Sequence, residues 1–118
     1  MEPTTDRVLL HLGRDRRRAI DAGDVYFLEA TGETTLVRLR ASKRLADLRS
    51  LGELHAVLAP FGLVRVHRNH AVNVRYVHEI RRRSGEADWE IRLEAPVNEV
   101  LPVGRTYLKR LWAAFGER

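Results

Sequence analysis

The first half of the chain consists of short hydrophobic segments with the length and pattern of β-strands. Residues 34–41 alternate hydrophobic and polar positions with the period of a half-buried strand, and the apolar run at 25–30 indicates a buried strand. Shorter strands are predicted at 8–13 and 18–21 and within 42–48. Glycine-containing segments at 22–24 and 31–33 are typical of the turns that separate such strands. The N-terminal half is therefore expected to form antiparallel hairpins.

The period changes at Ser50. Ser50 and Glu53 have the spacing of a capping box, in which each side chain satisfies a backbone N–H group near the helix start. Leucine positions follow at helical spacing from residue 51 to residue 58, and Pro60 cannot continue a helix. We therefore predict a helix that begins after Ser50 and ends before Pro60.

The second half returns to short strands and closes with a helix. Strands are predicted at 63–67, 77–82, 89–93 and 100–103, with turns at 84–85 and at Pro96. A helix is predicted from about residue 105 to 115, with Leu108, Leu111, Trp112 and Phe115 on one face. These elements indicate a mainly β fold with two short α-helices.

Length and composition restrict the class of protein. A chain of 118 residues suffices for one domain, which we place at 8–116, with residues 1–7 as a flexible N-terminus. The absence of cysteine excludes disulfides and thiol chemistry. The apolar run at residues 8–10 is too short for a signal peptide or a membrane helix, so we expect a cytoplasmic protein without membrane insertion.

The positive charge is concentrated in one segment. The net charge is +5, and residues 61–83 contain six arginines against one acid, Glu79. Residues 84–100 are acidic, with five carboxylates against Arg92. A basic segment of this kind favours a polyanionic partner.

No motif in the sequence indicates an enzyme. A P-loop, a paired-glycine dinucleotide turn and a nucleophile elbow are all missing from the sequence. His67 and His70 have a spacing that suits a metal, but a zinc site needs more ligands, and no acid or cysteine is near them in sequence. We therefore expect no catalytic residue, no metal and no cofactor.

Residues 63–80, LVRVHRNHAVNVRYVHEI, resemble the signature of the LytTR DNA-binding domain family of bacterial transcription regulators. Arg65, His67, Arg68, Val72 and Asn73 match that signature in register. Residues 23–30, 51–58 and 101–111 resemble three other segments of the family, in the same order. The resemblance covers about residues 8–116.

The resemblance implies an elongated stack of small antiparallel β-sheets that lays loops into successive major grooves of duplex DNA. Carried over position by position, the base-reading residues are Thr34 (with Glu33 as the alternative register), Arg68 and Arg105. Arginine can form a bidentate hydrogen bond with guanine in the major groove, which agrees with this assignment.

Other residues are expected to touch the DNA backbone or to support the readers: Arg65, His67, Asn69, His70, Asn73, Arg75 and Lys109. Three of them also have a purely structural interpretation. Arg65 can form a structural salt bridge, and His67 can be a hydrogen-bonded structural residue. Asn73 can satisfy backbone groups in an irregular loop. The arginines at 81–83 fit either a solvated strand end or a phosphate clamp.

Several positions depart from the family pattern. Asn69, His70 and Ala71 replace a serine, an aromatic residue and a larger apolar residue, and Gly104 stands where a serine commonly begins the last helix. Family members usually also carry a receiver domain, for which 118 residues leave no room. The chain is thus expected to be either a free-standing regulator or a part of a longer one.

The sequence favours a sequence-specific transcription regulator that binds double-stranded DNA as two copies on repeated half-sites. The expected partners are double-stranded DNA, a second copy of the chain in a homodimer on DNA, and a regulatory protein. The alternative is a signalling or scaffold module of the same fold, which binds a protein partner and DNA only weakly. A single-stranded nucleic-acid binder is a third hypothesis, but such proteins stack bases on exposed aromatic residues, and Phe61 and Tyr76 are expected to be buried.

Overall fold

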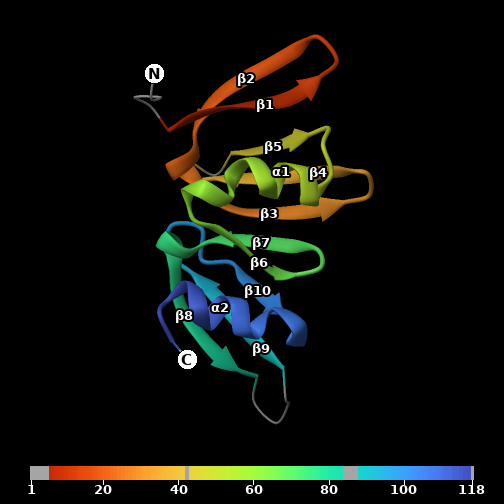
Figure 1. Ribbon diagram of the computed structural model, residues 1–118. Helices are drawn as coiled ribbons and strands as arrows, with labels where there is room; N and C mark the ends of the chain where they lie inside the picture. Colours follow the sequence, from red (N-terminus) through yellow and green to blue (C-terminus); the bar gives the residue numbers. More distant parts are fainter. Residues whose placement is uncertain (1–5, 42, 84–87, 118) are drawn as a thin grey trace.

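The computed structural model describes residues 6–41, 43–83 and 88–117, and there it contains three antiparallel sheets stacked along a long axis (Figure 1). The first sheet pairs β1 (Arg7–Gly13) with β2 (Arg16–Asp21). The central sheet has the order β5-β4-β3-β7-β6, from β3 (Val25–Thr31), β4 (Thr34–Leu39), β5 (Arg44–Asp47), β6 (Leu63–His67) and β7 (His70–Asn73). The third has the order β10-β9-β8, from β8 (Val77–Arg82), β9 (Trp89–Leu93) and β10 (Val100–Val103).

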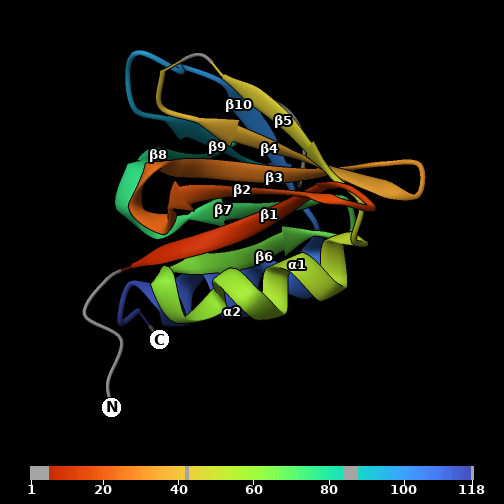
Figure 2. The same ribbon diagram turned by 90° about the horizontal axis from the view of Figure 1, so that it is seen from above.

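Two α-helices, α1 (Leu51–Leu58) and α2 (Leu108–Ala114), lie on the same side of the stack (Figure 2). Short 3₁₀ turns connect the strands: η1 (Ala22–Asp24), η2 (Ala59–Phe61), η3 (Val74–Tyr76) and η4 (Arg105–Tyr107). The molecule measures 48 × 33 × 26 Å, which confirms the elongated, mainly β architecture implied by the resemblance. Neither described α-helix is long and apolar enough to cross a membrane.

The stack contains two hydrophobic cores that share the central sheet. Leu28 of β3 packs in the first core, with Leu10 of β1 and Leu54 of α1. Its neighbour Phe27 packs in the second core, with Ile91 of β9 and Leu111 of α2. Successive side chains of a strand point to opposite faces, so β3 contributes to both cores and holds the three sheets in one body.

Most predicted elements are present. Ser50 accepts a hydrogen bond from the backbone N–H of Glu53 while the Glu53 carboxylate accepts one from the backbone N–H of Ser50, which confirms the capping box. The prediction of an irregular loop around Asn73 was wrong, because residues 70–73 form β7 between β3 and β6. The closing helix begins as the 3₁₀ turn η4 rather than as α-helix. The turn predicted at 84–85 lies outside the described residues, and the domain boundary expected at residue 8 lies one residue after the start of β1.

Asp47 joins the first sheet to the central one. Its buried carboxylate accepts hydrogen bonds from the backbone N–H of His11 at 2.8 Å and from the guanidinium of Arg49 at 2.9 and 3.0 Å. Arg49 also donates to the carbonyl oxygen of Leu9 at 2.9 Å. Burial raises the pKa of Asp47, but the hydrogen bonds from Arg49 and His11 outweigh it, and the pKa lies below its ordinary value of 3.8.

Candidate nucleic-acid interface

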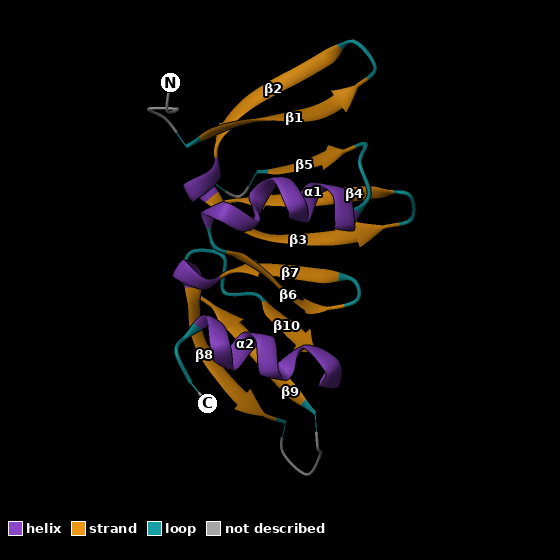
Figure 3. Ribbon diagram, in the orientation of Figure 1, coloured by secondary structure: helices purple, strands orange, loops and turns teal. Residues whose placement is uncertain are grey.

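Three chain segments that carry the predicted base-reading residues lie along one long edge of the molecule (Figure 1). They are the β3–β4 turn, the β6–β7 turn and the start of η4, and we call this edge, residues 31–34, 67–70 and 104–107, the loop edge. Coloured by secondary structure, the two hairpin turns project beyond the ends of their strands on the same side (Figure 3). The fold therefore gathers side chains that are far apart in the sequence.

The β6–β7 turn presents Arg68 from a fixed backbone. The guanidinium of Arg65 donates hydrogen bonds to the carbonyl oxygens of Arg68 at 2.8 Å and His67 at 3.3 Å, and it lies 5.7 Å from the ring centroid of Tyr107. The backbone N–H of Asn69 donates to Nδ1 of His67 at 3.1 Å. The Arg68 side chain is exposed and forms no ion pair with any residue that the structure describes. Arg65 and His67 thus support the turn that holds Arg68.

The β3–β4 turn is closed by its two threonines. The hydroxyl groups of Thr31 and Thr34 lie 3.1 Å apart, and Thr34 Oγ1 also donates to the carbonyl oxygen of Thr31 at 3.3 Å. Gly32 has φ +67°, a left-handed conformation that glycine adopts readily. Glu33 is exposed at the tip, whereas Thr34 is half-buried, so the two candidate registers present different chemistry to a ligand.

Hydrogen bonds fix the distance between the two hairpin turns. The backbone N–H of Ala30 donates to the carbonyl oxygen of Asn69 at 2.9 Å. The carboxylate of Glu29 lies 3.5 Å from Nε2 of His70. One contact is between backbone groups and the other is between side chains, and together they hold the β3–β4 and β6–β7 turns at a fixed separation.

A glycine brings η4 against β6. The backbone N–H of Gly104 donates to the carbonyl oxygen of Val66 at 2.7 Å. A Cβ atom at residue 104 would lie 3.1 Å from the ring of Tyr107 and 3.7 Å from the Cα of His67. Glycine at residue 104 thus avoids crowding where the third segment meets the β6–β7 turn.

Arg105 has an acidic neighbour that the sequence did not reveal. Its side chain is 80% exposed, and its Nε lies 3.7 Å from Oδ1 of Asp88. Asp88 precedes β9 and is distant from Arg105 in sequence. The acidic composition of residues 84–100 was the one feature of the sequence related to this contact, and it did not identify the pair. An exposed pair of this kind is weak and can be exchanged for a phosphate or a base.

The two histidines of the β6–β7 turn are predominantly neutral at pH 7. Burial lowers the pKa of His67, and the charges of Arg68 and Arg65 lower it further. Burial also lowers the pKa of His70 more than the neighbouring Glu29 carboxylate raises it. Their rings form an edge-to-face pair with centroids 5.4 Å apart. Among the described residues, no group of three or more His, Asp or Glu side chains is arranged to hold a metal ion.

Two of the predicted supporting residues lie away from the loop edge. Asn73 is buried, donates to the carbonyl oxygen of Val25 at 2.9 Å and accepts from the backbone N–H of Arg75 at 3.1 Å. Arg75 belongs to η3, at the end of β7 opposite the β6–β7 turn, and lies over the ring of Tyr76. Lys109 is exposed in the first turn of α2, immediately after η4.

The positive charges at the end of β8 are partly balanced by a carboxylate of the neighbouring strand β9. Arg81 and Arg83 lie 2.9 and 3.3 Å from the carboxylate of Glu90, and Arg82 lies 5.3 Å from the ring centroid of Trp89. Of the two interpretations of residues 81–83, these contacts support a solvated strand end over a phosphate clamp. Tyr76 is half-buried and stacked on Tyr26 with ring centroids 4.0 Å apart, so it offers no open face of the kind that single-stranded nucleic acid requires.

Comparison with known proteins identifies the family. The sequence model of the LytTr DNA-binding domain matches residues 15–116. A solved structure from Bacillus cereus, the LytTr DNA-binding domain of a protein described as a methyl-accepting/DNA response regulator, superposes with a TM-score of 0.75 at 22% sequence identity, over 95% of this chain and 98% of that chain. A comparison with curated proteins found no match. The chain belongs to the LytTR DNA-binding domain family, which supplies DNA-binding modules to bacterial transcription regulators.

Proposed function

We propose that this protein is a sequence-specific transcription regulator that places its loop edge against one face of duplex DNA in the bacterial cytoplasm. Arg68 and Arg105 read guanine edges in the major groove, since each can donate two hydrogen bonds to the guanine acceptors. The tip of the β3–β4 turn, with Glu33 and Thr34, reads a third position. Arg65, His67, Asn69 and His70 keep the central turn in shape, and Lys109 adds a backbone contact.

The observation that carries this proposal is the rigid connection between the three segments of the loop edge. Asn69 is hydrogen-bonded to Ala30 at 2.9 Å and Val66 to Gly104 at 2.7 Å, so the turns keep a fixed spacing before any ligand arrives. A fixed spacing suits a ligand that repeats regularly, as the grooves and phosphates of duplex DNA do. Preorganisation also reduces the conformational entropy that binding would otherwise cost.

One copy of the domain contacts too few base pairs for high specificity. Three contacting segments supply only a few base-edge contacts, each worth about 1–3 kcal/mol of discrimination. We therefore propose that two copies bind repeated half-sites. Both copies then face the same side of the DNA, so the half-sites are a whole number of helical turns apart. Because the molecule is 48 Å long, one turn is too short for two copies, and we expect a spacing of about two turns, or roughly 20 bp.

Selection from a random duplex library, followed by sequencing, tests the proposal. We expect an enriched motif with guanines at two fixed positions, and tighter binding to that duplex than to a scrambled one of equal length and composition. Binding that is weak and equal for both duplexes would instead support the signalling or scaffold module that meets a protein partner.

A further inference from the structure

Positive charge is concentrated at the tip of the β1–β2 hairpin. We call residues 14–17, the two residues between the strands and the first two of β2, the β1–β2 turn. Arg14, Arg16 and Arg17 are all exposed there, and the only acid among these residues is Asp15. The side chains of Arg14 and Arg16 form no ion pair with any residue in the described part of the chain. Three arginines of like charge repel one another in the free protein, and an anion placed beside them relieves that repulsion.

The turn has a defined backbone despite its exposure. Gly13 and Arg16 pair at the end of the β1–β2 ladder, and the guanidinium of Arg17 donates to the carbonyl oxygen of Gly13 at 3.0 Å. The hairpin is fixed to the central sheet by the hydrogen bond from His11 to Asp47 at 2.8 Å and by that from Leu48 to His11 at 2.9 Å. The arginines are therefore carried on the rigid body of the domain.

The β1–β2 turn lies on the same side of the molecule as the loop edge. Figures 1 and 2 show it projecting in the direction of the β3–β4 turn, from two perpendicular views. β1 adjoins β5 at one edge of the central sheet, and η4 adjoins β6 at the opposite edge. The order along the loop edge is therefore the β1–β2 turn, the β3–β4 turn, the β6–β7 turn and η4. The β1–β2 turn is thus the outermost of the four segments.

We propose that the β1–β2 turn is a further DNA contact, in which Arg14, Arg16 and Arg17 bind backbone phosphates beyond the base pairs that the β3–β4 turn reads. This inference rests on the proposed function of the loop edge. Neighbouring strands lie about 4.8 Å apart, and about three such spacings, with β5 between, separate the midpoint of the β1–β2 hairpin from that of the β3–β4 hairpin. The two midpoints are therefore roughly 15 Å apart. At about 3.4 Å per base pair this distance lengthens the footprint by roughly 4–5 bp.

The extension has a direction. The β1–β2 turn lies beyond the β3–β4 turn, while Arg105 lies at the other end of the loop edge, so each bound copy contacts additional phosphates on one side only. The contacts carry no base information, because arginine binds every phosphate alike. They set the orientation and the affinity of each copy on its half-site.

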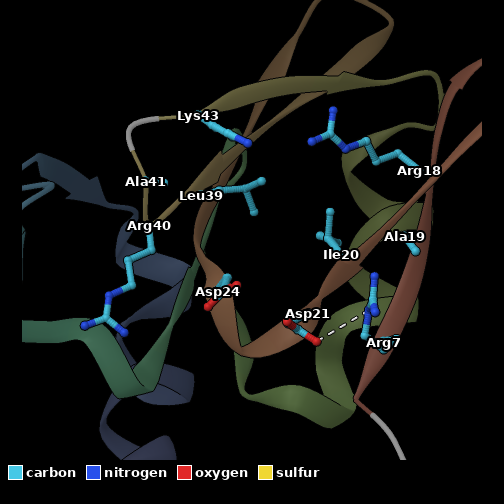
Figure 4. A pocket seen from close by; sticks show the side chains of 10 residues that line it. All are labelled: Arg7, Arg18, Ala19, Ile20, Asp21, Asp24, Leu39, Arg40, Ala41 and Lys43. Atoms are coloured by element: carbon cyan, nitrogen blue, oxygen red, sulfur yellow. Dashed lines mark ion pairs between the residues drawn. The ribbon is translucent and has the colours of Figure 1, made fainter.

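Hydroxyl-radical footprinting on the selected duplex tests this inference, with Arg14→Ala/Arg16→Ala compared with the wild type. A matched control is Arg40→Ala/Lys43→Ala, which also removes two exposed cations. Those two line a pocket of about 310 Å³ between β2 and the end of β4, shown in Figure 4, at the end of β4 away from the β3–β4 turn. A third variant, Asp15→Asn, removes the acid of the turn.

The wild type should protect roughly 4–5 bp more than Arg14→Ala/Arg16→Ala, at the end of the site farther from the base pairs that Arg105→Ala affects. The double variant should bind about three- to tenfold more weakly and flatten the slope of log Kd against log salt by about one to two. Asp15→Asn should bind more tightly, and Arg40→Ala/Lys43→Ala should keep the full footprint.

An unchanged footprint and salt slope in Arg14→Ala/Arg16→Ala would overturn the inference, provided that the wild type prefers the selected duplex. Equal loss in Arg40→Ala/Lys43→Ala would also overturn it, because the effect would then come from net charge alone. If the wild type shows no preference for any duplex, the proposed function of the loop edge fails as a whole. The two failures are thus distinguishable in one series.

Discussion

Arg65 donates a hydrogen bond to the carbonyl oxygen of Arg68 at 2.8 Å, so one arginine holds the turn from which the other projects. A second bond to the carbonyl oxygen of His67 uses another N–H group of the same guanidinium. The planar fork of arginine suits two carbonyl groups at once, and a lysine ammonium does not reproduce this geometry. The relationship makes Arg65 a positioning residue for Arg68.

Replacement of Arg65 should therefore weaken DNA discrimination. We expect Arg65→Ala to reduce the preference for the cognate duplex about tenfold, since a hydrogen bond from a charged group is worth about 1.5–3 kcal/mol. Arg65→Lys, which retains the charge, should restore little of it. NMR amide shifts of Arg68 and Asn69 would report the loosened turn directly. Full rescue by Arg65→Lys would show that charge, and not the fork, is what matters.

Arg68→Ala and Arg105→Ala should collapse the preference for the cognate duplex, each at a cost of about 1–3 kcal/mol on that duplex only. Arg82→Ala is the matched arginine control, because Arg82 packs over Trp89 at the end of β8. It should leave the preference intact, with at most an equal loss on cognate and scrambled duplexes. The measurement is one binding series with two duplexes at two salt concentrations. Wild-type preference in both Arg68→Ala and Arg105→Ala would refute the base-reading assignment.

Asp88→Asn should strengthen DNA binding. It removes the carboxylate that lies 3.7 Å from Arg105 and also a negative charge near the DNA backbone. The gain should be about two- to fivefold at low salt and should vanish at high salt, where exposed charges are screened. Glu94→Gln removes a carboxylate at the opposite end of β9 and should change binding little. Equal gains in both variants would point to net charge as the cause.

Ser50→Ala should destabilise the fold without altering the recognised sequence. The Ser50 hydroxyl accepts the hydrogen bond of the Glu53 N–H at 3.2 Å, and loss of such a cap costs about 1 kcal/mol. For a domain of this size the melting temperature should fall by roughly 3–6 °C. Repeating the duplex selection with the variant should return the wild-type motif. A shifted motif with unchanged melting would mean that α1 takes part in recognition.

Asp47→Asn should destabilise the protein in a pH-dependent manner. Removal of a buried charge that is bonded to Arg49 and His11 costs about 2–3 kcal/mol at neutral pH. The folded-state pKa of Asp47 lies below 3.8, so its contribution is complete above that value and is lost as the pH falls through the folded-state pKa. Urea titrations at several pH values should show the gap between wild type and variant narrowing below about pH 4. A gap that stays constant into acid would contradict this role for Asp47.

The sequence reveals the elements whose signals are local. The strand alternation, the capping box at Ser50 and the leucine spacing of α1 all depend on neighbours within one or two turns, and the structure confirms them. Strand β7 escaped prediction because its residues 70–73 combine two polar side chains with a small one, and its stability comes from pairing with β3 and β6. Local pattern carries no information on such partners.

The family, the mainly β class and the three segments expected to read DNA could be inferred from the amino-acid sequence, because they depend on the order and spacing of residue types. Which of the candidate residues share an edge depends on the packing of the folded chain. Arg65, His67 and Asn69 join the turn of Arg68, whereas Arg75 lies beyond the far end of β7 and Asn73 is buried beside β3. The pairing of Arg105 with Asp88 and the alignment of the β1–β2 turn with the loop edge likewise arise from packing between segments far apart in sequence. Such contacts are set by how the sheets stack, and the stacking is a property of the whole fold.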